Sequence, residues 1–394
     1  MDDNFYIEVH CAQKNSGEER ICGDVFLSRK ISEEGRTIIV LSDGMGHGVK
    51  ANVLATLTAT MALNFTQEHK EPEKIAEIIM NTLPVCSERK MSYSTFTIID
   101  IQEHGTVNIL EYDNPQTFIF RGEKLFDPPW SCLVLKTVKN AGKEIKICSF
   151  HSQIEDRIFI CSDGITQSGM GTPNYPFGWG LDDVHDYAGK LISNNPVISA
   201  RRISAKIVNM ANKNDGFSSK DDTSCATIYF RRPRKLLVCT GPPYEKEKDA
   251  ELADAVRKFE GKKIISGATT ADIIARELEY PIEDTMTFDD PDLPPISYMK
   301  NIDLVTEGIL TLTKVTRILK DYSSSYPLGK GPADKIVNLF RESDEINFII
   351  GTRINIAHQD PSLPVELEIR RTVVKRMAKI LEDKFLKKVY IRYI

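Results

Sequence analysis

The first part of the chain, up to about residue 230, alternates short apolar runs with turns. Runs rich in β-branched and aromatic residues and bounded by turn residues predict strands at 37–41, 95–101, 107–112, 117–121 and 157–161. Helical spacing of apolar residues and helix-start signals predict helices around 53–61 and at 72–83, 182–192 and 196–212. This order predicts a system of antiparallel sheets flanked by helices.

The pattern changes after the basic, proline-containing segment 231–235. Beyond it, predicted strands at 236–239, 263–266, 303–305, 346–350 and 389–393 are separated by predicted helices at 249–259, 270–279, 312–319, 333–340 and 365–386. Regular alternation of strands and helices predicts a parallel, doubly wound α/β domain. We therefore expect two domains, 1–232 and 233–394, and a length of 394 residues agrees with this division.

Composition narrows the function classes. The chain is 41% hydrophobic and 27% charged, which is typical of globular proteins. Its formal net charge of -5 argues against a general nucleic-acid-binding protein, which needs a basic surface. The acidic N-terminus does not resemble a signal peptide, and no apolar run approaches the ~18 residues of a membrane helix. We expect a cytoplasmic protein that binds neither nucleic acid nor membrane.

The sharpest local feature is an apolar strand that ends in Asp43 and continues through Gly44, Gly46 and Gly48 into a helix. An acid at a strand end is held rigidly. Glycines beside it let the backbone approach a bound ion and leave a peptide carbonyl free to serve as a second oxygen ligand. The alternative is an ordinary strand-to-helix turn in which Asp43 caps the helix.

Further acids occupy similar positions. Asp163-Gly164 follows the strand 157–161, Asp221-Asp222 precedes the last strand of the first domain, and Asp24 begins a strand at 25–27. Acids at neighbouring strand ends repel one another unless cations lie between them. Oxygen ligands favour Mg²⁺ or Mn²⁺ over Zn²⁺. Two such ions ~3.5–4 Å apart can activate a water and clamp a phosphoryl group, so the pattern indicates a phosphate-ester hydrolase without a covalent intermediate.

In this order, the segments Gly23-Asp24, 42–48, 162–165 and 221–223 resemble the PPM (type 2C) protein phosphatases, in the branch of sporulation stage II protein E. The resemblance covers roughly residues 5–230 and implies an α-β-β-α sandwich with two Mn²⁺ or Mg²⁺ ions. It implies that Asp43 bridges both ions and that the Gly44 carbonyl completes one of them. The other implied site residues are Asp163 and Asp221 on the second ion, Asp24 acting through a metal-bound water, and Asp222, which is grouped with the metal site but is expected to orient it.

The resemblance also implies a substrate and a mode of control. The substrate would be phosphoserine or phosphothreonine on a partner protein, often a small anti-sigma-antagonist domain. The helices expected around 49–65 and at 72–83 would act as a switch that completes the metal site. Ordinary core helices are the alternative, because amphipathic spacing alone does not distinguish the two.

The second domain offers a different kind of site. Glycine-containing loops follow its predicted strands at 240–243, 267–270, 306–308 and 351–353. Ligands of open parallel sheets collect outside these strand ends, and the loop 267–270 leads into a helix, which suits an anion. Neither a dinucleotide G-x-G-x-x-G motif nor a P-loop occurs in the sequence. Two interpretations remain open: a small-ligand sensor, or a docking or homodimerisation domain.

Two other functions compete with the phosphatase. A GHKL-type kinase or ATPase also places Asp and Gly after a strand, but it needs one acid and an Asn-bearing helix upstream. Here the upstream segment is strand-like, and three further acidic strand ends are present. A catalytically degenerate phosphatase-fold scaffold would lack metal ligands, yet every expected acid is present.

Overall fold

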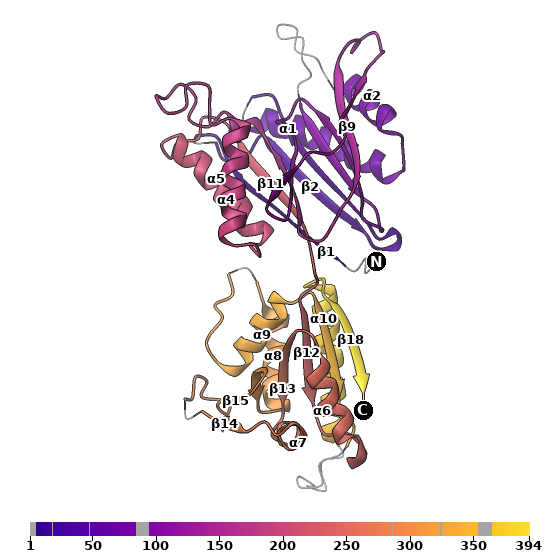
Figure 1. Cartoon of the computed structure of the whole chain (residues 1–394), viewed down its shortest axis with the longest axis vertical. Helices are drawn as coiled ribbons and strands as arrows, with labels where there is room; N and C mark the ends of the chain where they lie inside the picture. Colours follow the sequence, from indigo (N-terminus) through magenta and orange to yellow (C-terminus); the bar gives the residue numbers. More distant parts are fainter. Residues whose placement is uncertain are drawn as a thin grey trace. The chain divides into compact units, whose positions relative to one another are not determined.

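The computed structural model describes residues 5–17, 19–46, 48–83, 94–285, 287–323, 325–353 and 365–394, without the side chains of 365–368. Contacts between Cα atoms divide it into two units, Met1–Arg232 and Pro233–Ile394 (Figure 1). Across the described ranges, no helix is both long and apolar enough to cross a membrane.

The N-terminal unit contains two antiparallel sheets. One has the strand order β1-β11-β10-β6-β7, with β1 at Tyr6–Lys14, β11 at Thr223–Arg231, β10 at Asp156–Cys161, β6 at Phe118–Arg121 and β7 at Lys124–Phe126. The other has the order β2-β3-β4-β5-β9-β8, with β2 at Asp24–Ile31, β3 at Arg36–Asp43, β4 at Phe96–Ile101, β5 at Thr106–Tyr112, β9 at Glu144–His151 and β8 at Ser131–Val134.

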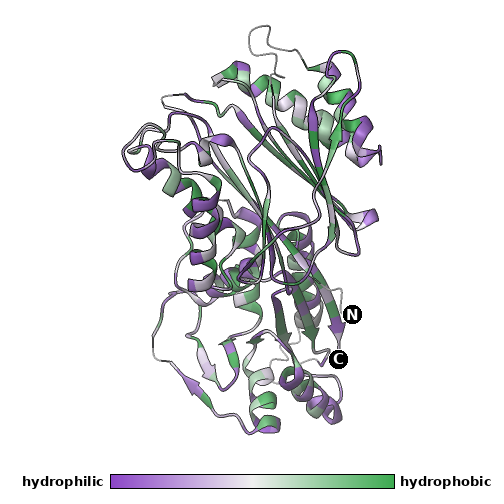
Figure 2. Ribbon diagram, turned by 45° about the horizontal axis from the view of Figure 1, so that its top comes forward, coloured by the Kyte–Doolittle hydropathy of each residue, from purple (hydrophilic) through white to green (hydrophobic). Residues whose placement is uncertain are grey.

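Helices cover the outer face of each sheet. On β3, Ile39 and Leu41 pack between the two sheets, while Ile38 and Val40 pack under α1 (Gly48–Gln67) and α2 (Pro72–Thr82). A strand buried on both faces reads as a continuous apolar run, because successive side chains alternate between faces. The sheet that contains β10 is covered by α4 (Leu181–Asn194) and α5 (Ala200–Asn214). The predicted α-β-β-α sandwich is therefore confirmed (Figures 1 and 2).

The C-terminal unit is a seven-stranded sheet of order β14-β15-β16-β13-β12-β17-β18. Its five parallel strands are β12 (Lys235–Thr240), β13 (Lys262–Ser266), β16 (Ile302–Thr306), β17 (Glu345–Ile350) and β18 (Lys388–Tyr393). The strand order reverses between β12 and β17, so the predicted doubly wound fold is confirmed. An antiparallel hairpin of β14 (Ile282–Asp284) and β15 (Ser297–Met299) extends the β16 edge, which the sequence did not predict.

Helices lie on both faces of this sheet (Figure 1). One face carries α6 (Asp249–Lys258) and α7 (Ala268–Leu278). The other carries α8 (Ile309–Asp321), α9 (Pro332–Glu342) and α10 (Val365–Asp383). Apolar clusters therefore fill both sides of the parallel strands, as expected for two-sided burial.

Where predicted and observed boundaries differ, local chemistry explains the difference. The helix predicted at 196–212 begins at Ala200, because the Ser199 side chain accepts a hydrogen bond from the Arg202 backbone N–H and caps it. The strands β1, β7, β8 and β9 were not predicted; β7 and β8 have only three and four residues, which carry too short a pattern.

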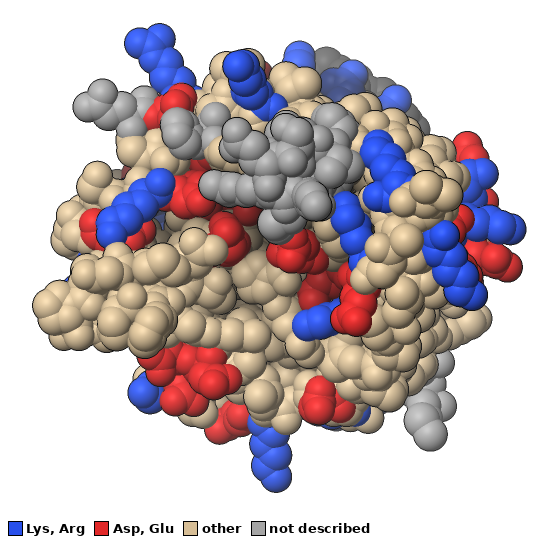
Figure 3. Space-filling view, turned by 90° about the horizontal axis from the view of Figure 1, so that it is seen from above, with Lys and Arg blue, Asp and Glu red and all other residues tan. Residues whose placement is uncertain are grey.

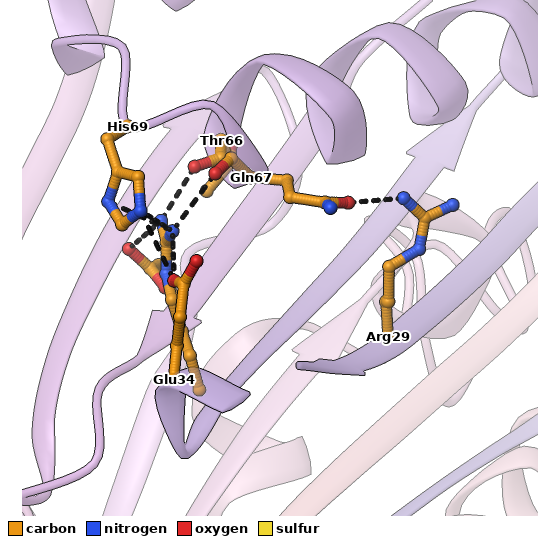
Figure 4. Close-up of polar contacts among 7 residues, drawn as sticks. Arg29, Glu34, Thr66, Gln67 and His69 are labelled. Carbon is orange, nitrogen blue, oxygen red and sulfur yellow. Dashed lines mark hydrogen bonds and ion pairs between the residues drawn. The ribbon is translucent and has the colours of Figure 1, made fainter. Parts of the chain in front are cut away.

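The buried Arg36 fixes the C-terminal end of α1. Figure 4 shows this end of the helix, with Thr66 and Gln67 labelled. Nε and Nη2 of Arg36 donate to the two carboxylate oxygens of Asp100 at 2.7 and 2.8 Å. Nη2 also donates to the Thr66 carbonyl at 2.6 Å, and Nη1 donates to the Gln67 carbonyl at 3.3 Å. The guanidinium thus satisfies final carbonyls of α1 that have no partner within the helix.

Replacing Arg36 with Met should destabilise the N-terminal unit by roughly 3–5 kcal/mol, because the Asp100 carboxylate would be left without its partner. Chemical denaturation followed by circular dichroism measures this. Arg29 is the control: it is exposed and bonds only surface groups among its described contacts, so Arg29→Met should cost under about 1 kcal/mol. Equal losses in the two variants would contradict a special role for Arg36.

Candidate functional site

The predicted acids meet around a cavity of about 400 Å³ in the N-terminal unit. Asp43, Asp163 and Asp221 all line it. Its other described lining residues are Met45, Gly46, Ser94, Thr95, Asp113, Asn114, Pro115 and Gln167. Figure 3 shows a face of the molecule on which Asp and Glu side chains gather. The fold thus brings together acids that are up to 178 residues apart in the sequence (221 minus 43).

Asp24 lies beside Asp43 but is buried behind the cavity. The two residues stand directly opposite each other in the antiparallel pair β2–β3. Asp24 is only 3% exposed, and its Oδ2 accepts a hydrogen bond of 2.6 Å from the Ser224 hydroxyl. Its Oδ1 is buried without a hydrogen-bond partner within the described part of the chain. This oxygen is therefore positioned to accept from a group that the side chains here do not provide.

Asp163 and Asp221 come from the neighbouring sheet. Asp163 follows β10 and begins the short helix α3 (Asp163–Thr166), and Gln167 Nε2 donates to its carboxylate at 2.8 Å. The Asp163 carboxyl lies near that of Asp43, and its charge contributes to raising the pKa of Asp43. Asp221 precedes β11, and its Oδ1 accepts from the Asp222 backbone N–H at 2.8 Å. The acids that line the cavity thus come from both sheets.

Asp222 points elsewhere. Its Oδ1 accepts from the Ser16 backbone N–H at 2.9 Å, and its Oδ2 accepts from the Gly23 backbone N–H at 2.8 Å. It is 2% exposed and is not among the described residues that line the cavity. These contacts hold the turn that carries Asp24. They fit the expected orienting role and leave the carboxylate without an oxygen directed at the cavity.

Both Asp-Gly pairs need glycine for a reason that the sequence did not reveal. A Cβ on Gly44 would lie 2.1 Å from the Ala51 carbonyl oxygen, and one on Gly164 would lie 2.2 Å from the Asp222 carbonyl oxygen. Backbone from α1 and from the start of β11 therefore packs directly against the two turns. The glycines allow the close approach of another chain segment, in addition to any approach of an ion.

Burial and mutual repulsion raise the pKa values of these acids. Burial is the main cause that raises the pKa of Asp24 to about 7; the hydroxyls of Ser224 and Ser162 oppose this rise, and the charges of Asp222 and Asp163 contribute to it. Burial, followed by the charges of Asp24, Asp163 and Asp221, raises the pKa of Asp43 well above its usual range. The pKa of Asp163 is also raised, chiefly by burial. Ionisation of the cluster is therefore unfavourable without added positive charge.

The turn after β5 adds residues that sequence reasoning missed. Asp113 adopts a left-handed backbone with φ 61°, and Asn114 Nδ2 donates to the Thr97 hydroxyl at 3.0 Å. Burial raises the pKa of Asp113. An Asp-Asn-Pro turn directly after a predicted strand was the available signal. His47, within the segment 42–48, lies outside the described residues.

The donor set fits a hard divalent cation. Carboxylate oxygens are the ligands that Mg²⁺ and Mn²⁺ prefer, and Asp24 Oδ1 is a buried oxygen with no partner in the described ranges. Within those ranges, no group of three or more His, Cys, Asp or Glu side chains has the geometry of a ready-made metal site. The Asp43 and Asp163 carboxyls interact with each other there, and the charge of Asp163 contributes to raising the pKa of Asp43.

A four-layer sandwich with acidic strand ends meeting at one cavity defines the PPM class of phosphatase folds. The family model described as "Stage II sporulation protein E (SpoIIE)" matches residues 33–231, which is 199 of 394 residues. The chain therefore belongs to the SpoIIE family, a protein phosphatase family. No curated protein matches the sequence.

Solved structures with similar folds are remote in sequence. The phosphatase domain of SpoIIE from Bacillus subtilis is 16% identical, with 58% of this chain and 94% of that chain covered and a TM-score of 0.44. RsbX in complex with magnesium is 18% identical, with coverages of 57% and 95% and a TM-score of 0.41. The catalytic domain of PstP in complex with manganese is 10% identical, with coverages of 58% and 99% and a TM-score of 0.36.

The raised pKa values predict how stability depends on pH. With the folded pKa of Asp24 about 7 against an ordinary 3.8, the metal-free folded chain binds more protons than the unfolded chain between those values. Its stability should therefore fall as pH rises from about 4 to 7, by up to ~1.4 kcal/mol per unit of pKa difference. Excess Mn²⁺ favours the ionised form of the acidic cluster and should remove the part of this fall that Asp24 contributes. Thermal unfolding across pH 5–8, with chelator and with Mn²⁺, measures both effects.

Glu111 provides the control for this measurement. Burial raises its pKa to about 7 as well, yet its Oε2 bonds Thr117 and it does not line the described cavity. Asp24→Asn should flatten the pH dependence only in the metal-free state, whereas Glu111→Gln should flatten it with and without Mn²⁺. An Asp24→Asn variant with an unchanged metal-free profile would contradict the assignment.

Proposed function

We propose that the protein is a metal-dependent serine/threonine protein phosphatase that hydrolyses phosphoserine or phosphothreonine on a partner protein. The observation that carries the proposal is the cavity lined by Asp43, Asp163 and Asp221, together with the buried Oδ1 of Asp24, which has no hydrogen-bond partner among the described residues. The pKa values of Asp24, Asp43 and Asp163 are all raised. A buried acidic cluster of this kind is stabilised by divalent cations.

The proposed roles divide the acids between two Mn²⁺ or Mg²⁺ ions. Asp43 would contact both ions, with the Gly44 carbonyl as a further ligand of one, while Asp163 and Asp221 would hold the other. Asp24 would act through a bound water. When bound, two such ions supply an activated water and stabilise charge on the phosphoryl group and the leaving oxygen.

The surrounding residues orient these ligands. Gln167 holds Asp163 at 2.8 Å, Ser224 holds Asp24 at 2.6 Å, and Asp222 holds the Gly23 backbone at 2.8 Å. Partners of this kind fix the position of ligand oxygens and are a regular part of metal sites. Their presence favours an active enzyme over a degenerate scaffold, which would have no need for oriented carboxylates. A kinase is not proposed, because the chain belongs to a phosphatase family.

The substrate is proposed from family membership together with the form of the site. A cavity of about 400 Å³ accommodates a phosphorylated side chain, and the family resemblance favours a small anti-sigma-antagonist-like domain as the partner. The helices α1 and α2 remain candidates for a switch, since α1 begins two residues after Gly46, which lines the cavity.

Asp43→Asn and Asp163→Asn should each lower Mn²⁺-dependent hydrolysis of p-nitrophenyl phosphate by roughly 10³-fold, because each removes a charge from the site that holds the ions. Asp156 is the matched control: it is a fully buried aspartate that begins the same strand, β10, and pairs with Arg121. Asp156→Asn should cost stability but retain the specific activity of the folded protein. Full activity in Asp43→Asn or Asp163→Asn would refute the two-metal assignment.

A further inference from the structure

Two helices of the C-terminal unit begin at adjacent strand ends. Ser266 pairs with Thr306 at the last position of the parallel strands β13 and β16, so the chain leaves both strands at the same sheet edge. It then enters α7 and α8, which pack on opposite faces of the sheet. The N-termini of two helices thus approach one edge from both sides.

Glycines bring these N-termini into contact. Gly267 is the N-cap of the 11-residue helix α7, and Gly308 is the N-cap of the 13-residue helix α8. A Cβ built on Gly308 would lie 3.4 Å from the Gly267 Cα atom. Neither N-cap has a side-chain hydrogen bond. The first backbone N–H groups of both helices have no acceptor within their helix, and the positive ends of the two helix dipoles coincide.

Two buried hydroxyls lie at matching positions in these helices. Thr270 and Thr311 each stand three residues after the N-cap glycine, and they are 1% and 0% exposed. Neither hydroxyl has a hydrogen-bond partner among the described residues. Thr270 Oγ1 lies 3.4 Å from the position of a Cβ on Gly267, so it is directed towards the start of its own helix. A buried hydroxyl without a hydrogen-bond partner costs about 1–3 kcal/mol of folding stability. Two such hydroxyls at matching positions therefore call for an explanation.

Other threonines show why these two are unusual. Later in α8, Thr313 and Thr316 donate to the backbone carbonyls four residues before them, at 2.7 and 2.8 Å. The corresponding acceptor for Thr311 is the Glu307 carbonyl, which already accepts from the Ser266 and Thr306 hydroxyls at 2.9 Å each. Hydrogen bonding at the strand ends therefore leaves the Thr311 hydroxyl available for a ligand.

Glu307 gives the edge an acceptor as well as donors. Its Oε2 is buried and has no hydrogen-bond partner in the described part of the chain. A carboxylate repels a bare anion but accepts hydrogen bonds from hydroxyl groups. The combined donors and acceptor therefore suit a ligand that carries both an anionic group and hydroxyls.

We propose that this edge of the C-terminal unit binds a small phosphate ester that carries hydroxyl groups, such as a sugar phosphate or a nucleotide. The phosphate would accept from the N–H groups at the starts of α7 and α8 and from the Thr270 and Thr311 hydroxyls. A ligand hydroxyl would donate to Glu307. This site is independent of the proposed phosphatase activity and gives the second unit a ligand-sensing role.

Isothermal titration calorimetry on the full chain tests the proposal. Chelator is kept present so that the acidic cavity of the first unit does not bind phosphate through metal. Ribose 5-phosphate or AMP should bind, while ribose and adenosine should bind at least tenfold more weakly. The relative affinities of ribose 5-phosphate and AMP distinguish a sugar phosphate from a nucleotide. Absence of binding by both phosphate esters at millimolar concentration would overturn the proposal.

Conservative variants locate the site. Thr270→Val and Thr311→Val remove hydroxyls without changing side-chain shape, and each should weaken binding about tenfold, equal to ~1.4 kcal/mol. Thr313→Val, in the same helix, is the control and should bind normally. Binding that is unaffected by either of the first two variants, or equally reduced in Thr313→Val, would show that the ligand binds elsewhere.

Glu307→Gln distinguishes the binding of the ligand's phosphate group from the binding of its hydroxyl groups. Loss of the negative charge should strengthen the binding of inorganic phosphate and weaken that of ribose 5-phosphate, bringing the two affinities closer. An unchanged ratio of the two affinities would remove Glu307 from the proposed site. Thermal unfolding of each variant without ligand verifies that the C-terminal unit is folded.

Discussion

The mutual repulsion of buried carboxylates is the constraint on which the N-terminal unit depends. Asp24 and Asp43 face each other across β2 and β3, and Asp163, from the other sheet, adds its charge to those that raise the pKa of Asp43. Burial raises the pKa of each above its ordinary value. Such a cluster is tolerated only when protons or cations compensate it. The divalent ions that we propose for this site would relieve the same repulsion.

The sandwich makes this arrangement rigid. Ile39 and Leu41 anchor β3 in the core between the sheets, and Ile38 and Val40 anchor it under the helices. Direct backbone packing at Gly44 and Gly164 attaches α1 and the start of β11 to the two acidic turns. Because α1 is also held at its far end by Arg36, a displacement of that helix would reach the cavity through Ala51 and Gly44.

Both units place polar groups at strand ends, but the groups suit ligands of opposite charge. The first gathers carboxylates at strand ends, an arrangement that attracts cations. The second gathers helix N-termini and buried threonine hydroxyls at strand ends, which attract an anion. In both units, glycine at the strand end allows the close approach of backbone segments.

The sequence by itself predicted most strands and helices, the doubly wound second domain and the candidate acids, because strand ends and glycine turns are encoded locally. The α-β-β-α sandwich followed from the resemblance of those motifs to the PPM family. It did not reveal that Asp222 bonds Ser16 and Gly23, that Asp113 and Asn114 line the cavity, or that the Thr311 hydroxyl lacks a partner in the described structure. Those features depend on contacts between segments far apart in the chain. Local pattern specifies where a strand ends, whereas only the tertiary structure decides which side chains meet there and which direction each carboxylate faces.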